Sequence, residues 1–333
     1  MKYILVDTAN TFFRARHVIN GSADIKLGMA FHITLNSIKK AWNDFGGDHV
    51  VFCLEGRSWR KDYYPPYKRN RSEARAAHTE KEAEEETVFW EAFDTFKTFI
   101  SEKTNCTVLQ NQQLEADDLI AGFIQAHPND EHIIISTDTD FVQLIASNVK
   151  QYNGVSETTI THEGIFDAKG KRVIDKKTQE PKDVPDPEWL LFQKCMRGDP
   201  TDNVFSAYPK VRVNKLQEAF VDRTSKGFAW NNMMLQRWVD HNGTEHRVLE
   251  DYERNRVLID LAAQPKDIRT IINETIDTQA IPKSVDQVGI RLLKFCNLYD
   301  LKKITDNITQ YAEPFQSRYP ESAVTWRKLQ QET

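Results

Sequence analysis

Three short apolar runs, rich in β-branched residues, each lead into carboxylate residues, and this pattern constrains the fold more than any other feature of the chain. The runs and their acids are residues 3–6 with Asp7, residues 50–54 with Glu55, and residues 132–137 with Asp138 and Asp140. Such runs are typical of strands buried in a parallel sheet. Helical patterns lie between them, so crossover connections would bring the carboxyl ends of the strands to one edge. We predict an α/β fold with an acidic sheet edge.

A fourth acidic group, in residues 114–120, has the pattern of a first helical turn. Glu115 and Asp118 are three residues apart and share a helix face, with Asp117 beside them. Two further acids, Asp199 and Asp202, follow a predicted helix end. At an effective dielectric constant of about 20, two like charges ~4 Å apart repel by roughly 4 kcal/mol. Divalent cations would relieve this repulsion, and a set of oxygen donors without His or Cys favours Mg²⁺ or Mn²⁺.

The predicted metal ligands are therefore nine carboxylates: Asp7, Glu55, Glu115, Asp117, Asp118, Asp138, Asp140, Asp199 and Asp202. Each group also has a simpler interpretation. Asp7 can be a helix N-cap, Asp117 and Asp118 can be dipole-favoured acids of a first turn, and the others can be turn residues. Their convergence on one edge is what favours the metal site.

Composition predicts an ordinary two-domain protein in the cytoplasm. The chain has 333 residues, of which 40% are hydrophobic, and it contains no apolar run of the ~18 residues that a membrane span needs. Its start, residues 1–6, leads into a strand rather than a signal peptide. The four cysteines are far apart in the sequence and are interpreted as reduced core residues.

A basic segment, residues 57–75, stands out against the overall net charge of −5. It holds seven cations and two anions, a local net charge of +5, with Trp59, Tyr63, Tyr64 and Tyr67 among them. The cations predicted to contact nucleic acid here are Arg57, Arg60, Lys61, Lys68, Arg69 and Arg71. Cations for phosphates and rings for bases form the combination that grips single strands. A solvated basic loop is the alternative.

The order of patterns predicts a boundary near residue 185. Helices are expected near residues 29–45, 83–102 and 116–126, and residues 156–185 read as a loop or small hairpin. Asp186 and Pro187 have the N-cap and N1 pattern of a helix start, and the remaining chain is mostly helical. We predict an α/β domain over 1–184 and a helical domain over 185–333. In a turn between helices, Lys210, Arg212 and Lys215 can contact a duplex backbone, or can belong to a plain surface turn.

Taken together, these motifs resemble the structure-specific 5′ nucleases, the flap endonuclease and 5′→3′ exonuclease family, and within it the bacteriophage ribonuclease H type. The motifs are residues 4–7, Glu55 followed by residues 67–71, residues 115–118, 136–141 and 198–203, in the family's order. The resemblance covers roughly residues 1–310. It implies a PIN-like, mostly parallel sheet, a basic arch at about 57–80, and a helix-three-turn-helix-like element that holds duplex.

The resemblance also implies roles for residues. Six acids fall where the family places residues that bind metal directly or through water, and Asp117 and Asp202 lie close by; the six are Asp7, Glu55, Glu115, Asp118, Asp138 and Asp140. Lys68 and Arg71 match arch cations that contact the scissile phosphate, and Tyr67 matches a ring that can stack on a base. Two departures stand out. Glu55 replaces the usual Asp, which would alter rate or the preference between Mg²⁺ and Mn²⁺. The Gly-x-Gly turn of the cellular enzymes is absent after Asn203, so duplex binding would depend more on Lys210, Arg212 and Lys215.

The expected chemistry is phosphodiester hydrolysis with two divalent ions. The expected substrates are RNA or DNA annealed to a template and 5′ flaps, cut to leave 5′-phosphates, with removal of RNA primers in phage DNA replication as the use that the resemblance suggests. A single-strand-binding protein or replicative polymerase is a possible partner by resemblance, and the protein is expected to be a monomer without membrane association.

The sequence also allows three other interpretations. A haloacid-dehalogenase-type phosphatase would need a donor two residues after Asp7, where the chain has Ala9. A non-catalytic nucleic-acid binder would have lost some of the acids. A PIN-type ribonuclease for single-stranded RNA would not need the chain beyond about residue 186.

Overall fold

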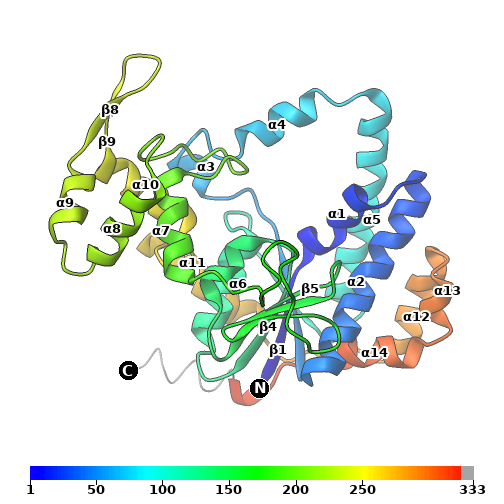
Figure 1. Ribbon diagram of the computed structural model, residues 1–333. Helices are drawn as coiled ribbons and strands as arrows, with labels where there is room; N and C mark the ends of the chain where they lie inside the picture. The colour runs from blue at the N-terminus through cyan, green and yellow to red at the C-terminus, as the bar shows by residue number, and fades with distance from the viewer. Residues whose placement is uncertain (324–333) are drawn as a thin grey trace. The chain divides into compact units, whose positions relative to one another are not determined.

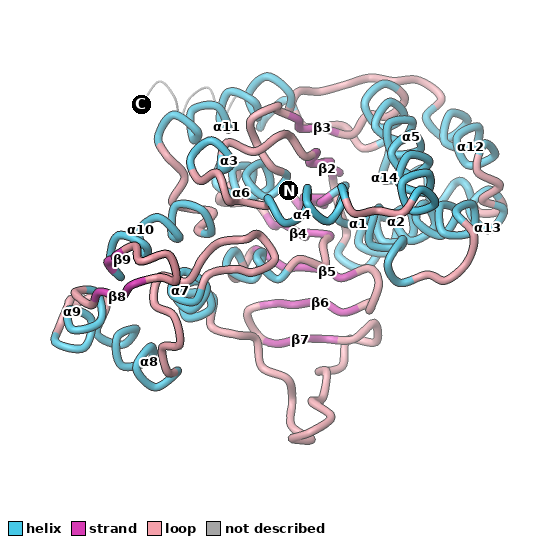
Figure 2. Tube along the Cα trace, turned by 90° about the horizontal axis from the view of Figure 1, so that it is seen from above, coloured by secondary structure: helices cyan, strands magenta, loops and turns pink. Residues whose placement is uncertain are grey.

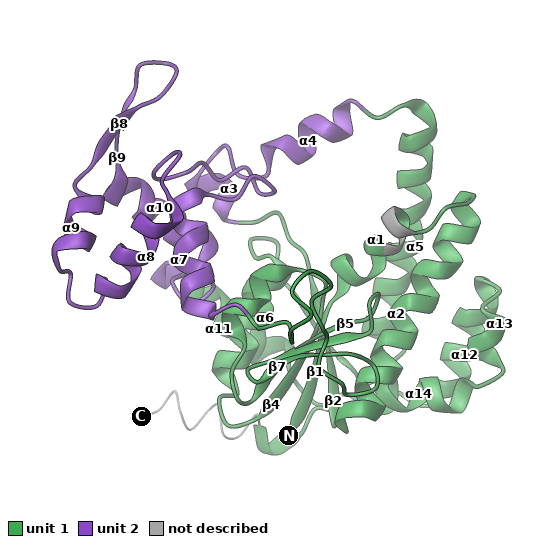
Figure 3. Ribbon diagram, viewed as in Figure 1, with its two compact units in different colours: residues 1–58, 78–184, 269–333 green, residues 59–77, 185–268 purple. Residues whose placement is uncertain are grey.

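The computed structural model describes residues 1–323, without the side chains of residues 15, 17 and 18 (Figure 1). The chain forms two compact units (Figure 3). Unit 1 comprises residues 1–58, 78–184 and 269–333, and unit 2 comprises residues 59–77 and 185–268. The break after residue 184 coincides with the predicted boundary. The division otherwise differs, because the chain returns to unit 1 at residue 269 and residues 59–77 belong to unit 2. Residues 324–333 of the predicted second domain lie outside the described residues.

Unit 1 is built on a seven-stranded sheet of order β3-β2-β1-β4-β5-β6-β7 (Figure 2). The strands are β1 (Lys2–Asp7), β2 (His49–Leu54), β3 (Thr107–Gln110), β4 (Glu131–Ile135), β5 (Val149–Asn153), β6 (Thr158–Thr161) and β7 (Gly164–Phe166). The first five in this order are parallel, and β6 and β7 add antiparallel pairs. The predicted, mostly parallel sheet is confirmed, and the β6–β7 hairpin lies in the segment expected to be a loop or small hairpin.

Helices cover both faces of this sheet. They are α1 (Thr8–Val18), α2 (Ala23–Phe45), α5 (Glu80–Glu102), α6 (Ala116–Ala126), the 3₁₀ helix η1 (Thr139–Leu144), α11 (Lys266–Gln279), α12 (Val288–Leu298), α13 (Lys302–Thr305) and α14 (Ile308–Gln316). The helix predicted over 116–126 has those bounds. The other two begin earlier than predicted, because the Ser22 and Thr79 side chains accept hydrogen bonds as N-caps at those points.

Aromatic packing explains why the last described helices return to unit 1. Phe31 of α2 and Phe96 of α5 lie with Phe295 of α12 in one buried cluster, with ring centroids 5.2 and 5.8 Å from that of Phe295. On the strands, Tyr3 packs edge-on against Phe123 of α6, at 5.0 Å. Each fully buried ring removes a large apolar area from water and contributes of the order of 2 kcal/mol.

Unit 2 is mainly helical. Its elements are α3 (Arg60–Tyr63), α4 (Arg69–Ala76), α7 (Pro187–Arg197), α8 (Val213–Asp222), α9 (Phe228–Met234), β8 (Arg237–Val239), β9 (Glu245–Arg247) and α10 (Val248–Ile259). Its core includes Phe192, Met196 and Leu216. The predicted start of α7 is confirmed, because the Asp186 side chain accepts from two backbone amides and Pro187 is at N1. The β8–β9 hairpin was not predicted. None of the helices in the described residues is long and apolar enough to cross a membrane.

Candidate active site

The carboxyl edge of the sheet collects the acids that follow its central strands. Asp7 is the last residue of β1, Glu55 comes directly after β2, and Asp138 comes three residues after the end of β4. Strand β1 pairs in parallel with both β2 and β4, with Val6 opposite Phe52 on one side and Ile135 on the other. The three strands therefore end at the same level, and their acids lie along one edge as the sequence predicted.

A close backbone contact brings Glu55 to the start of α6. The Gly56 amide donates to the Leu114 carbonyl at 2.7 Å, and the Ala116 amide donates to Glu55 Oε2 at 3.4 Å. A Cβ atom at position 56 would lie 2.1 Å from the Asn111 carbonyl oxygen, so only glycine fits there. The strand-end acid is thus held at a helix N-terminus, where the dipole favours a negative charge.

Glu115 and Asp118 form a reciprocal capping box at the start of α6. Each carboxylate accepts from the other residue's backbone amide, with the Glu115 amide 3.1 Å from Asp118 Oδ2. Both side chains are buried. The simpler interpretation of these acids as helix-terminus residues is therefore observed, and it places two buried carboxylates beside Glu55.

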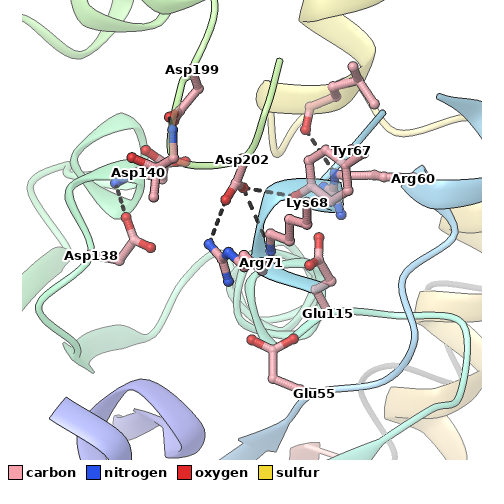
Figure 4. Close-up of polar contacts among 12 residues, drawn as sticks. Glu55, Arg60, Tyr67, Lys68, Arg71, Glu115, Asp138, Asp140, Asp199 and Asp202 are labelled. Atoms are coloured by element: carbon pink, nitrogen blue, oxygen red, sulfur yellow. Dashed lines mark hydrogen bonds and ion pairs between the residues drawn. The ribbon is translucent and has the colours of Figure 1, made fainter. Parts of the chain in front are cut away.

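Ser136 connects Asp7 to the acids that follow β4. Its hydroxyl donates to Asp7 Oδ2 at 2.7 Å and accepts from the Asp138 amide at 3.0 Å. The Asp140 amide then donates to Asp138 Oδ1 at 2.9 Å (Figure 4). The Gln151 side chain on β5 donates to the Ser136 carbonyl at 3.2 Å. The sequence motifs identify the acids but assign no role to Ser136 or Gln151, because the Ser136–Asp7 bond joins residues 129 positions apart and the bond from Gln151 depends on strand pairing.

The pKa of the Cys53 thiol reflects the negative electrostatic potential at the carboxyl edge of the sheet. Burial raises the pKa of its thiol well above the ordinary value, and the charges of Asp7, Asp117 and Glu55 raise this pKa further. A negative charge on Cys53 would lie in the field of three carboxylates that come from three different elements. The same field would attract a cation.

The donor set fits a hard divalent cation, because every candidate ligand of unit 1 is a carboxylate oxygen. Within residues 1–323, however, no three His, Cys, Asp or Glu side chains form a group ready to hold a metal ion. The edge therefore provides the right ligands at the ends of adjacent elements, without a compact cluster of side chains.

Asp199 and Asp202 lie in unit 2, in the turn that follows α7. Asp199 accepts from the Thr201 amide at 2.8 Å, and its other oxygen lies 3.4 Å from Lys194 Nζ. Asp202 binds the basic segment: its carboxylate accepts from Arg71 at 2.5 Å and from the Tyr67 hydroxyl at 3.0 Å (Figure 4). The role of these two acids as metal ligands stays a prediction.

Two residues of the basic segment do not have the exposure that the sequence suggested. Arg60, predicted to contact nucleic acid, is 1% exposed, and its Nε donates to the Leu258 carbonyl at 2.8 Å. Tyr67, predicted to stack on a base, is 4% exposed and packs with Cys195 and Val204. In this structure neither the Arg60 guanidinium nor the Tyr67 ring is exposed to solvent. The local packing of unit 2 uses both side chains, and the expectations that Arg60 contacts nucleic acid and that Tyr67 stacks on a base stay predictions.

The remaining predicted cations are mostly accessible. Exposed side chains are Arg57, Lys61, Arg69, Arg71, Lys210, Arg212 and Lys215, whereas Lys68 is half-buried. Lys210, Arg212 and Lys215 lie around a cavity of about 420 Å³, beside Phe228 of α9. Unit 2 thus presents a group of cations around a partly apolar hollow.

The chain thus combines a mostly parallel sheet, whose carboxyl edge carries carboxylates, with a cation-rich helical region. Residues 2–171 match the family described as the 5′-3′ exonuclease, N-terminal resolvase-like domain. This match covers about half of the chain, and the chain belongs to that family.

Individual relatives agree with this assignment. The chain is 31% identical to ribonuclease H of Enterobacteria phage T4 over 205 residues, which cover 56% of this chain and 56% of that protein. It is 27% identical to the flap endonuclease of Escherichia phage T5 over 205 residues, which cover 60% of this chain and 63% of that protein. The matched segments therefore span less than two thirds of either relative.

Solved structures show the same fold. A bacteriophage T5 flap endonuclease, described as a pseudo-enzyme-product complex with DNA and metal ions, has a TM-score of 0.56 at 19% identity. The comparison covers 94% of this chain and 100% of that one. The α/β sheet with a further helical region, predicted from the sequence, is confirmed by this likeness.

Proposed function

We propose that this protein is a divalent-metal-dependent 5′ nuclease that acts as a 5′→3′ exonuclease and flap endonuclease on duplexes and RNA/DNA hybrids. The observation that carries the proposal is the set of acids at the carboxyl edge of the sheet, supported by the family membership. The relatives named above are called a ribonuclease H and a flap endonuclease. We extend both activities to this chain, with 5′-phosphate products.

In this proposal the acids of unit 1 hold two Mg²⁺ ions, for which Mn²⁺ can substitute. The ligands are Asp7, Glu55, Glu115, Asp117, Asp118, Asp138 and Asp140, with Asp199 and Asp202 as further candidates. When bound, such ions lower the pKa of water and neutralise charge on the attacking and leaving oxygens. Ser136 and the capping box of α6 hold the carboxylates in place by hydrogen bonds.

Unit 2 supplies the groups proposed to bind the substrate. Lys68 and Arg71 would neutralise charge on a phosphate, and no His base is needed. Lys210, Arg212 and Lys215, in the turn before α8 and at its start, would contact the backbone of a duplex without reading its bases. The segment from α7 to α8 would then be the helix-three-turn-helix-like element.

The biological role that we propose is removal of RNA primers in phage DNA replication, within the host cytoplasm. It rests on the similarity to a phage ribonuclease H. A replicative polymerase or a single-strand-binding protein stays a predicted partner, and the monomeric state stays a prediction.

The test compares the wild type with Asp138→Asn on two substrates, a 5′-labelled DNA flap and an RNA/DNA hybrid. Cleavage is measured in Mg²⁺ and in Mn²⁺, and binding is measured in Ca²⁺. We expect the wild type to cleave both substrates to 5′-phosphorylated products and the variant to bind without cleaving. Binding by both proteins with no cleavage by the wild type in either metal would leave a structure-specific binder and refute the nuclease.

A further inference from the structure

A set of hydrogen bonds within unit 2 attaches the basic segment to the turn after α7. The Lys68 amide donates to the Asp202 carbonyl at 2.8 Å, and the Asn203 side chain donates to the Pro66 carbonyl at 2.7 Å. The Asn70 side chain donates to the Pro200 carbonyl at 3.2 Å. Backbone groups of both segments take part in these hydrogen bonds. The contact therefore fixes the position of the chain at Lys68 and does not depend on long side chains alone.

The Asp202 carboxylate lies among three donors at the centre of this contact. Arg71 Nη2 is 2.5 Å from Oδ1, and Oδ2 is 3.0 Å from the Tyr67 hydroxyl and 3.6 Å from Lys68 Nζ (Figure 4). The Asp202 and Lys68 side chains are only 17% and 13% exposed. A charge pair with this little exposure is screened less by water and salt than a pair at the surface.

Arg71, Lys68 and a hydroxyl are also the donors that recognise a phosphate. Arginine binds carboxylates and phosphates through the same charge-assisted hydrogen bonds, and lysine adds a point charge to either. In the proposed function, Lys68 and Arg71 bind a phosphate of the substrate. In this structure both cations already contact an anion of the protein itself, the Asp202 carboxylate.

We propose that Asp202 is an internal competitor, which occupies the anion position formed by Tyr67, Lys68 and Arg71 until a phosphate of the substrate displaces it. The inference rests on the proposed function, because the competing phosphate is that of a nucleic acid. A competitor of this kind lowers the affinity for nucleic acid in proportion to the fraction of molecules in which it occupies the site. It also keeps the two cations in place while no substrate is bound.

The consequence is opposite to that of an ordinary binding residue. Removing the charge of Asp202 strengthens the binding of nucleic acid in the absence of metal, because Lys68 and Arg71 become available while the side chain keeps its shape. It also makes affinity more sensitive to salt, because the substrate then releases counterions at cations that were previously neutralised.

The experiment measures binding of a labelled 5′-flap DNA in EDTA, over a series of salt concentrations, for the wild type, Asp202→Asn and Glu73→Gln. Glu73 is a matched control, because it is an exposed acid in the same segment and pairs with Arg69 at 3.1 Å. We expect Asp202→Asn to bind about three- to tenfold more tightly, with a salt slope steeper by roughly one phosphate contact. Glu73→Gln should change the affinity less than twofold. Chelation of metal separates this effect from any role of Asp202 as a metal ligand.

Further variants test the mechanism. Adding Arg71→Gln to Asp202→Asn should remove most of the gain, since the gain comes from the freed cations. If the asparagine variant does not fold, Asp202→Ser is put through the same measurements.

Equal or weaker binding by Asp202→Asn, or a gain matched by Glu73→Gln, would overturn the inference. In that case the nuclease proposal would stand if the wild type still binds and cleaves the flap. If neither the wild type nor the variants bind nucleic acid, both proposals fail.

Discussion

The acids of unit 1 and those of unit 2 are positioned by different means. In unit 1, Asp7 ends a strand, Glu55 follows one, and Glu115 and Asp118 cap a helix. In unit 2, Asp202 binds Arg71, a residue 131 positions away in the sequence. The first arrangement follows from secondary structure and from the order of strands. The second depends on the packing of a turn against a segment from a distant part of the chain.

This difference implies different responses to mutation. Neutralising an acid of unit 1 should leave the fold in place, because strands and caps tolerate an amide of the same shape. It should remove a proposed metal ligand. Changing the turn of unit 2 should alter the structure itself. Four predictions follow this contrast, in order of decreasing effect.

The largest effect is expected for Asp7→Asn. The amide oxygen can still accept from Ser136, so the fold should survive, but the lost charge should lower the cleavage rate by about 1,000-fold. Single-turnover cleavage of a flap substrate and a thermal melt measure the two properties. Asp48→Asn is the control, because Asp48 precedes β2 at the opposite end of the strand, and its rate should stay within about twofold of the wild type. Equal losses in both variants would contradict a site at the carboxyl edge.

Acidification should weaken unit 1 through His49. Burial is the main cause that lowers the pKa of this imidazole, to about 3, and Nε2 lies 2.9 Å from the Thr107 hydroxyl. The unfolded chain, with a pKa near 6.5, binds a proton that the folded protein excludes. Stability from this group is therefore complete above about pH 6.5 and falls as the pH drops toward 3, by at most about 5 kcal/mol.

Hydrogen exchange across this pH range, read separately for the two units, is the measurement. His49→Gln should flatten the response of unit 1, and an unchanged pH dependence in that variant would refute the assignment.

A side chain at Gly198 should destabilise the turn that follows α7 in unit 2. The φ of Gly198 is +76°, and a Cβ there would lie 2.2 Å from the Val204 carbonyl oxygen, so Gly198→Ala should destabilise unit 2 by about 3 kcal/mol. Gly243 has φ +83° with open space around it, so Gly243→Ala should cost only about 1 kcal/mol. Denaturant unfolding compares the two variants. Equal costs would show that the turn adjusts easily, and the contrast with unit 1 would disappear.

The smallest effect is expected for Arg57 and Arg60, of which the first is exposed and the second is buried. Arg57→Ala should weaken binding to DNA severalfold and reduce the salt slope by about 0.9, because this exposed side chain is predicted to contact a phosphate. Arg60→Ala should instead lower the melting temperature, because it removes a buried donor from the Leu258 carbonyl. A reduced salt slope for folded Arg60→Ala, equal to that for Arg57→Ala, would show that Arg60 contacts nucleic acid despite its burial.

Local patterns explain what the sequence predicted well. The β-branched runs predicted the strands of the parallel sheet, and the acids after them predicted its carboxyl edge. The bounds 116–126 of α6 follow from its capping residues. The Asp186–Pro187 start of α7 was readable for the same reason.

Long-range packing explains the rest. The return of residues 269 and beyond to unit 1 depends on rings such as Phe295, whose pattern shows an apolar helix face but not its partner. The burial of Arg60 and the bonds of Asp202 join residues that are far apart in the sequence, and the composition of the basic segment gives no sign of either.

The central claim is that the carboxyl edge of unit 1 binds divalent ions, and Mn²⁺ binding measured by calorimetry tests it most directly. Three proteins are compared: the wild type, Asp138→Asn, and Asp175→Asn, in which the changed acid lies in an exposed turn and accepts from the Lys177 amide. We predict that the wild type and Asp175→Asn bind Mn²⁺ with the same affinity and that Asp138→Asn binds it at least about tenfold more weakly. Equal affinity in all three proteins, or no binding by the wild type, would contradict the account.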